Sequence, residues 1–267
     1  MLISDQTGIP IDRIDVVHGD TDVVPQGGMT GGSRSLQVGG VAMHEAAVEL
    51  VALARQRAAD LLEAAVEDVV LDVASAAFHV AGTPAVARSW SEVAGAGVDP
   101  ADVLQVEHVF QSQGATFPSG AHLAVVEVDL DTGKVEVVRF VAADDAGRIL
   151  NPLLAEGQVH GGVAQGIAQA LLEEMVYDED GNPITSNLAD YAFVTACELP
   201  AFERLVVETP TPLNELGAKG IGESGTIGAT PAVQNAVVDA LAHLGVRHVD
   251  IPCTPERVWR TIVAATT

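Results

Sequence analysis

The alternation of apolar and polar positions predicts helices and strands in mixed order along the chain. Apolar residues three to four positions apart predict long helices at 36–65 and 153–174, and shorter ones at 90–94, 231–244 and 254–264. A period of two predicts strands at 14–17, 69–73, 78–80, 103–110, 121–130, 134–141 and 202–209. Strands and helices in this order are typical of an α+β fold, with mixed sheets and hairpins packed against several helices.

Turn residues refine this picture. Asp131-Thr132-Gly133 predicts a hairpin between the strands at 121–130 and 134–141, and Asp180-Gly181 predicts a second hairpin at 177–184. Residues 95–100 are typical of a linker. We therefore expect a first part at 1–98, with a glycine loop, a long helix and a hairpin. The second part, at 99–267, carries the other long helix and a later glycine loop.

Composition bounds the class of protein. With 48% hydrophobic and 19% charged residues, the chain can build a core. Its 13 basic and 37 acidic residues give a net charge of −24, which argues against nucleic acid or an anionic membrane as a partner. The two cysteines, Cys197 and Cys253, support no zinc site or iron–sulfur cluster. No apolar run reaches the roughly 20 residues of a membrane span, and no signal peptide is visible, so a cytoplasmic location is expected.

The stretch Gly217-Ala218-Lys219-Gly220-Ile221-Gly222-Glu223-Ser224-Gly225 surrounds one lysine and one carboxylate with glycine. Such a run indicates an unusual backbone path or the close approach of a ligand. Glu223 is then either a solvated turn residue or a general base at the bottom of a pocket. Taken alone, the loop slightly favours the solvated turn.

Two further glycine-rich segments are candidates for ligand contact. Gly31-Gly32-Ser33-Arg34 precedes the helix at 36–65, and a helix N-terminus beside an arginine suits a phosphate; a helix cap with a surface arginine is equally consistent. The second long helix contains glycines 157, 161, 162 and 166. Each costs roughly 1 kcal/mol relative to alanine, which indicates close packing against another backbone or a flat ligand.

Together these segments resemble the molybdenum hydroxylases, the family of xanthine oxidase and aerobic carbon monoxide dehydrogenase. The resemblance is to the C-terminal half of their molybdopterin-binding large subunit, and it covers nearly the whole chain. The matching segments, in order, are Gly19-Asp20-Thr21-Asp22, Gly32-Ser33-Arg34, Asp145 to Pro152, Gly157 to Gly166, Thr211 to Asn214 and Gly217 to Glu223.

The resemblance implies an oxidoreductase that hydroxylates an electron-poor carbon of an N-heterocycle, aldehyde or purine, or oxidises CO with added copper. It implies that Glu223 is the base, and that molybdopterin, expected as the cytosine dinucleotide, carries the molybdenum. It implies iron–sulfur clusters and FAD on partner subunits. The residues that it assigns to the cofactor are Gly32, Ser33, Arg34, Gln158, Gly161, Gly162, Lys219, Gly220 and Gly222, with Lys219 also ordering the loop around Glu223.

The chain departs from the family pattern at Met29, which replaces a glycine, and at Gly31, which replaces an aromatic residue. The family's large subunit is also much longer, so a partner chain is expected to supply its N-terminal half. Two hypotheses follow. The first is a catalytic half-subunit that is active only with partner subunits and would expose apolar surface alone. The second is a structural or assembly half, or a truncated fragment, with a degraded cofactor site.

Overall fold

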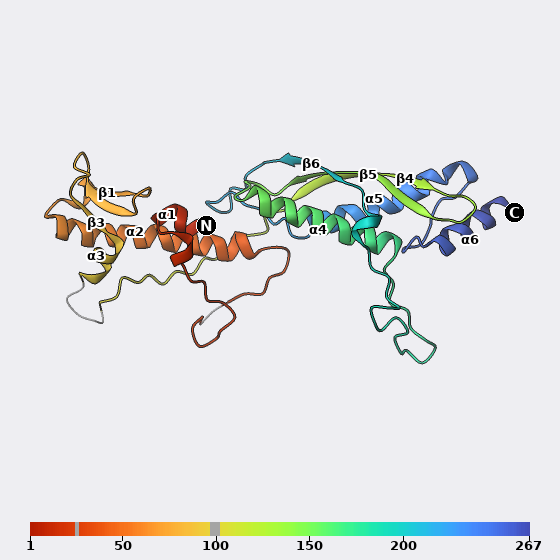
Figure 1. Ribbon diagram of the computed structural model, residues 1–267, viewed down its shortest axis with the longest axis horizontal. Coiled ribbons are helices and arrows are strands. Elements are labelled where there is room, and N and C mark those ends of the chain that lie inside the picture. The colour runs from red at the N-terminus through yellow and green to blue at the C-terminus, as the bar shows by residue number, and fades with distance from the viewer. Residues whose placement is uncertain (25–26, 97–101) are drawn as a thin grey trace. The chain divides into compact units, whose positions relative to one another are not determined.

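The computed structural model describes residues 1–24, 27–96 and 102–267 (Figure 1). These residues form two compact units, Met1–Gln113 and Gly114–Thr267. The boundary expected between residues 98 and 99 lies outside the described residues, as does most of the linker expected at 95–100. Four 3-10 turns accompany the longer elements, at Ile11–Arg13, Val66–Asp68, Ala196–Glu198 and Ala242–Leu244.

The first unit is built around one long helix. Its elements are α1 (Leu2–Thr7), a π-helical turn (Leu36–Gly40), α2 (Val41–Leu62), β1 (Val69–Asp72), β2 (Ala77–Val80), β3 (Ala87–Ser89) and α3 (Trp90–Gly95). The three strands form an antiparallel sheet in the order β1-β2-β3. Phe78 and Val93 are fully buried with alanines of α2, and Ser89 and Glu92 form a reciprocal capping box at the start of α3. The long helix, the hairpin and the Ser89 cap are thus confirmed.

Two predicted strands of this unit are wrong. Residues 14–17 and 103–110 have extended or irregular backbone without strand pairing. Val16 and Val17 are 57% and 54% exposed, so their alternation does not mark a buried face. A strand needs a neighbouring strand for its backbone hydrogen bonds, and sequence periodicity cannot show whether one is present.

The helical stretch Leu36–Leu62 has more apolar surface than its sequence suggested. It is 27 residues long, and its most apolar window has a mean hydropathy of 1.3 with 11% of the window buried. By length and composition alone it could cross a membrane, although no apolar run was expected to be long enough. The difference arises because its few charged residues are spread along an otherwise apolar helix.

Side chains, rather than strand pairing, tie residues 102–110 to α2. Arg57 binds Asp102 at 2.8 Å. His108 contacts Glu45 through Nε2 at 2.7 Å and Glu49 through Nδ1 at 2.8 Å. Glu45 and Glu49 are one helical turn apart and therefore lie on the same face of α2. These contacts raise the pKa of His108: the hydrogen bond to Glu45 contributes most, Glu49 adds to it, and desolvation opposes both.

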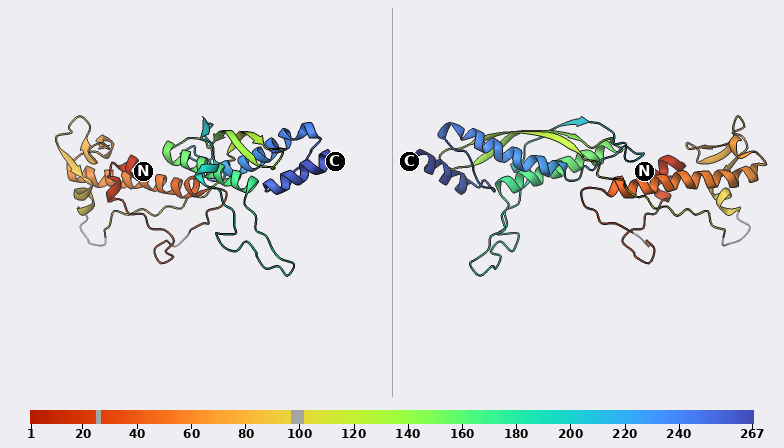
Figure 2. Two further views of the ribbon diagram at one scale, coloured as in Figure 1. Left: turned by 45° about the vertical axis from the view of Figure 1, so that its right-hand side comes forward. Right: turned by 180° about the vertical axis from the view of Figure 1, so that it is seen from behind.

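The second unit is a three-stranded sheet covered by helices. Its elements are β4 (Ser119–Val128), β5 (Val135–Asp145), α4 (Pro152–Leu171), β6 (Phe202–Val207), α5 (Ser224–Ala240) and α6 (Pro255–Thr266). β4 and β5 are antiparallel, as their hairpin turn predicts, while β6 joins β5 in parallel. α4 and α5 run side by side along one face of the sheet (Figures 1 and 2). The predicted mixed α+β architecture is confirmed.

The core of this unit lies between the sheet and the two helices. Burial alternates along β4, so that Ala124, Val126 and Val128 face the core. Fully buried Phe140 of β5 meets valines of α4 and α5, such as Val163 and Val233. Side-chain caps begin the helices: Asn151 accepts a hydrogen bond from the Leu154 N–H, and Thr254 from the Arg257 N–H.

The glycines of α4 divide into two sets. A Cβ on Gly162 would lie 3.0 Å from Cα of Gly225, and one on Gly166 would lie 2.6 Å from Cβ of Ala229, so both glycines let α5 approach closely. Gly157 and Gly161 have no such neighbour within 4 Å. The expectation of close backbone packing is confirmed for Gly162 and Gly166, and the other pair leaves a smooth exposed surface.

The helix predicted at 231–244 begins earlier than expected, at Ser224. Gly225, Gly228 and Pro231 all disfavour a helix and obscured its start in the sequence. Gly225 lies against the carbonyl oxygen of Val159, where a side chain would not fit. The correction moves Glu223 from a free loop to the N-cap of α5.

Alanine substitution will distinguish the two sets of glycines in α4. Gly166→Ala places a Cβ against Ala229 and is expected to lower the free energy of unfolding by about 1–3 kcal/mol. Gly157→Ala on the same helix meets no neighbour, and we expect it to raise that free energy by about 1 kcal/mol through helix propensity. Urea denaturation followed by circular dichroism measures both; equal effects of the two substitutions would contradict the assignment.

The contacts of His108 predict a pH dependence. Because the folded pKa lies above the ordinary value of 6.5, the contribution of His108 to stability is complete below pH 6.5 and is lost as the pH rises through the folded pKa. We expect His108→Gln to destabilise the first unit at pH 5.5 and to match the wild type at high pH. The midpoint of urea denaturation, measured between pH 5.5 and high pH, tests this prediction. His243→Gln, in the 3-10 turn Ala242–Leu244, is the control. A pH-independent difference would be inconsistent with the charged contact.

Candidate functional site

A buried ion pair holds the glycine loop 217–225 against the end of β5. Lys219 Nζ donates to Asp145 Oδ2 at 2.9 Å and to Thr209 Oγ1 at 2.8 Å. The side chains of Lys219 and Asp145 are 11% and 7% exposed. The ammonium of Lys219 thereby joins the loop to Asp145 and Thr209, and its direct contact with a cofactor stays a prediction.

Asp145 collects hydrogen bonds from three segments. Its carboxylate accepts from the Thr209 hydroxyl and N–H, from Lys219 and from the Gly147 N–H. Burial by itself raises the pKa of Asp145, but these hydrogen bonds, that of Thr209 first, outweigh it and hold the pKa far below its ordinary value. Asp145 is therefore a permanent anion that joins β5, the end of β6 and the glycine loop.

Two glycines make this junction possible. Gly147 and Gly217 both have positive φ, +68° and +65°, and Gly147 forms an isolated antiparallel bridge with Ala218. A Cβ on Gly147 would collide with the carbonyl oxygen of Gly217. That carbonyl oxygen accepts hydrogen bonds from the N–H groups of Arg148 and Thr211. Asn214 completes the turn by bonding both the N–H and the carbonyl of Ala218.

Glu223 lies at the N-terminus of α5, where the positive end of the helix dipole stabilises negative charge. Its side chain is exposed, so the described residues do not form the water-excluding pocket that was expected around it. Gly225, two residues later, packs on Val159 and Gly162 of α4. The start of α5, immediately after Glu223, is consequently held against α4.

One exposed face of α4 carries no side chains at two positions. Gly157 and Gly161 lie one turn apart with nothing within 4 Å of their Cβ positions, and Gln158 is exposed between them. Gly162 instead faces α5 and is buried, so packing explains its lack of a side chain. In the glycine loop, Gly220 is buried and Gly222 is half-buried next to Glu223.

The other residues predicted to contact the cofactor, Gly32, Ser33 and Arg34, belong to the first unit. Gly32 and Ser33 have positive φ, +64° and +55°, and Arg34 Nε donates to the Met29 carbonyl at 2.8 Å. A Cβ on Gly31 would lie 2.9 Å from Cε of Met29. The Met29 side chain thus lies over the position where the family's aromatic side chain would begin, so the two departures from the family pattern are linked in space.

One buried pair was missed by sequence reasoning. His122 Nε2 lies 3.1 Å from Asp144 Oδ1, and both side chains are 3% exposed. The His122 ring fills the space where a side chain on Gly228 of α5 would be. Residues 120 and 144 pair across the β4–β5 hairpin, which brings the two side chains together. Hairpin register was the only signal available, and it required the exact pairing of the strands.

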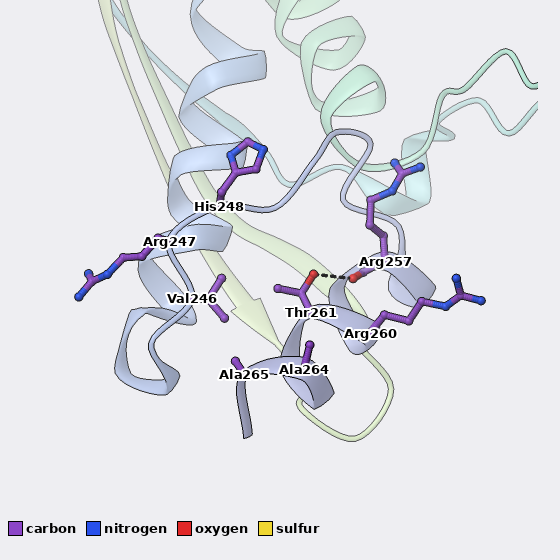
Figure 3. Close-up of a pocket in the computed structure, with 8 residues that line it drawn as sticks. All are labelled: Val246, Arg247, His248, Arg257, Arg260, Thr261, Ala264 and Ala265. Atoms are coloured by element: carbon purple, nitrogen blue, oxygen red, sulfur yellow. Dashed lines mark hydrogen bonds between the residues drawn. The ribbon is translucent and has the colours of Figure 1, made fainter. Parts of the chain in front are cut away.

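A hollow of about 510 Å³ lies away from all of these residues, at the C-terminal end of the second unit (Figure 3). Its lining is Val246, Arg247, His248, Arg257, Arg260, Thr261, Ala264 and Ala265. Arg257 pairs with Glu174, Arg260 with Glu256, and His248 with Asp250. Arg247 and Arg260 point away from the hollow in opposite directions (Figure 3), so its cations do not converge on a ligand.

The residues around Glu223 fit an organic cofactor better than a metal ion bound by protein side chains. Within the described ranges 1–24, 27–96 and 102–267, no three His, Cys, Asp or Glu side chains are grouped to hold a metal. The side-chain-free surface at Gly157 and Gly161, beside an exposed amide and a carboxylate, suits a flat heterocycle. A molybdenum held by a pterin needs no such cluster of protein ligands.

Comparison with known proteins identifies the family. Residues 1–200 match the molybdopterin cofactor-binding domain. The chain belongs to this family. The match includes α4 with Gln158 and Gly161, and ends before the loop with Glu223.

Relatives extend the match over the whole chain. The carbon monoxide dehydrogenase large chain of Hydrogenophaga pseudoflava is 40% identical over 98% of this chain and 33% of its own length. The crystal structure of a Cu,Mo-CO dehydrogenase matches with a TM-score of 0.86 at 36% identity, over 99% of this chain and 34% of that one. Quinoline 2-oxidoreductase from Pseudomonas putida 86 gives 0.74 at 40% identity, over 86% and 30%. The chain thus spans about a third of the length of these molybdenum hydroxylase relatives.

The ion pair predicts a large effect of one lysine. Lys219→Met leaves the carboxylate of Asp145 buried without its cation, and we expect a loss of about 3 kcal/mol in the free energy of unfolding. Lys134→Met, which removes a 70% exposed lysine 4.0 Å from Glu136, is the matched control and should change it by less than about 0.5 kcal/mol. Similar losses for both variants, measured by urea denaturation at pH 7, would refute the role of Lys219.

Proposed function

We propose that this chain is the part of a molybdenum hydroxylase large subunit that carries the general base and one wall of the molybdopterin site. The placement of Glu223 carries the proposal: it lies at the N-terminus of α5, two residues before Gly225, which packs against α4 at Val159 and Gly162. Membership in the molybdopterin cofactor-binding family supports it, as does the match with whole-chain relatives that are molybdenum-dependent dehydrogenases.

The proposed reaction oxidises a carbon centre with water as the oxygen source. For an electron-poor C–H of an N-heterocycle, aldehyde or purine, a C–H bond is replaced by C–OH, and two electrons and two protons are released. For CO, addition of water oxygen gives CO₂ with the same release. When bound, the molybdenum cofactor would supply the two-electron redox chemistry. The electrons leave to iron–sulfur clusters and FAD on partner subunits.

The residues of this chain have distinct parts in that proposal. Glu223 accepts a proton at its carboxylate oxygen, and the helix N-terminus stabilises its charge. Gln158 offers an amide donor and acceptor to the pterin, while Gly161 leaves room for its ring. Lys219 and Asp145 fix the backbone that leads to Glu223. Gly32, Ser33 and Arg34 are proposed to bind the dinucleotide phosphates of a cytosine dinucleotide form.

The exposure of Glu223 indicates what this chain lacks. A base that works on a reactive carbon is more effective when water is excluded from its surroundings. We infer that a polypeptide corresponding to the rest of the large subunit covers Glu223 and completes the substrate pocket, in a complex with iron–sulfur and FAD subunits in the cytoplasm. The structural alternative, an assembly half without a cofactor, is favoured by the altered residues Met29 and Gly31.

The test is Glu223→Gln in the complex purified with its partner subunits. Because the amide cannot accept the proton, turnover with CO or an N-heterocycle is expected to fall by roughly 10²–10⁴-fold. The molybdenum content, measured by mass spectrometry, should be unchanged. Glu127→Gln on the exposed face of β4 is the control for charge loss. Retained turnover would exclude Glu223 as the base, and a complex without molybdenum would favour the assembly alternative.

A further inference from the structure

Residues 173–195 form an arm that leaves the C-terminal end of α4 and projects from the second unit (Figures 1 and 2). Nothing in the proposed chemistry uses it. Six large apolar side chains along it are exposed: Met175 47%, Val176 38%, Tyr177 59%, Ile184 56%, Leu188 78% and Phe193 50%. So many exposed apolar residues on one segment mark a surface that another molecule covers.

Local hydrogen bonds give the arm a defined shape. The Ile184 N–H donates to the Val176 carbonyl at 2.7 Å, and the Val176 N–H donates to Thr185 Oγ1 at 2.9 Å. The carboxylate of Asp178 accepts hydrogen bonds from the N–H groups of Asp180 and Asn182, and these bonds close the turn at residues 178–182. The arm is therefore ordered before it binds, which lowers the conformational entropy lost on association.

Two contacts fasten the base of the arm to the unit. Tyr191 donates its hydroxyl proton to Glu173 Oε2 at 3.2 Å, and Glu174 accepts from Arg257 of α6 at 3.0 Å. Residue 173 lies at the beginning of the arm and residue 191 near its end, so the Tyr191 bond closes the loop. The apolar side chains of the arm remain exposed instead of packing into the core of their own unit.

The charge of the arm restricts its partner. It carries six acidic residues and no lysine, arginine or histidine: Glu173, Glu174, Asp178, Glu179, Asp180 and Asp190. A surface rich in basic residues would complement this charge better than a second copy of this chain, whose net charge is −24. The arm fits an apolar groove bordered by basic residues, on a polypeptide other than this one.

We propose that the arm docks into the polypeptide that supplies the rest of the large subunit. The relatives are about three times as long as this chain, so most of the surface available to cover the arm lies in that remainder. This inference rests on the proposed function only for the existence of such a polypeptide. It concerns assembly and does not require a bound cofactor.

The test co-expresses this chain with a defined probe, the part of the Hydrogenophaga pseudoflava large chain that it does not match. A photo-cross-linking amino acid replaces Leu188, or Leu130 as a control with 44% exposure in the β4–β5 turn. Cross-links from position 188 to the probe, and many fewer from position 130, are expected. Cross-links only between two copies of this chain, or none at all, overturn the proposal.

A second measurement uses the exposed positions Leu188 and Phe193, whose replacement leaves the core intact. The double variant Leu188→Ser/Phe193→Ser is expected to bind the probe roughly tenfold or more weakly in size-exclusion and titration experiments. The double variant Leu130→Ser/Val86→Ser should bind as the wild type does. Equal binding of the two double variants, or no complex with the wild type, contradicts docking by the arm.

The two proposals fail separately. A complex that forms through the arm but contains no molybdenum would overturn the catalytic function and leave the docking intact. A complex that contains molybdenum and tolerates both arm substitutions would overturn the docking alone.

Discussion

The contact between the backbones of α4 and α5 determines where the candidate base lies. Gly162 and Gly166 on one helix and Gly225 on the other remove the side chains that would hold the helices apart. Close-packed helices cannot slide without collisions, so the first turn of α5 is fixed on one turn of α4. Gly162 and Gly225 then become neighbours although 63 positions separate them in the sequence, and Glu223 lies two residues before this contact. These glycines lower the helix propensity of α4 and α5, but they allow the close contact that fixes one helix on the other.

The Asp145–Lys219 ion pair fixes the beginning of the glycine loop 217–225, whose end leads into α5. The chain enters the loop from a junction of β5 and β6 and leaves it as α5, so its two ends are tied to different parts of the sheet–helix layer. Loops with both ends anchored and several internal hydrogen bonds have few conformations available. The loop around Glu223 is thus held at both ends, because Gly147 and Gly217 allow contacts at its start that a side chain would prevent.

Much of the fold could be predicted from local signals. Asn151-Pro152, Thr254-Pro255 and Ser89 mark helix starts through side chains that bond the first free N–H groups. The start of α5 could not be found, because Gly225 and Gly228 are required by close contacts with α4 and β4 and, like Pro231, disfavour a helix. The segment 103–110 alternates like a strand but is bound through Asp102 and His108 to α2.

The candidate site was recognised through the order of its glycine segments, whereas its supporting contacts were not. Nothing in the sequence indicates that Asp145 pairs with Lys219, or His122 with Asp144, because such contacts depend on strand register and on the path of a distant loop. Exposure of Glu223 was also beyond prediction. The exposure of a residue depends on everything that surrounds it, including partner chains whose sequences are not part of this one.

The parallel pairing of β5 with β6 carries one more consequence. Parallel neighbours need a crossover connection, and here α4 and the arm together provide it. α4 covers the sheet. The arm that follows α4 lengthens the connection but does not affect the register between β5 and β6. A change in the length or sequence of the arm therefore need not alter the sheet. The same topology keeps the arm, which we propose acts in assembly, outside the sheet and helices that position Glu223.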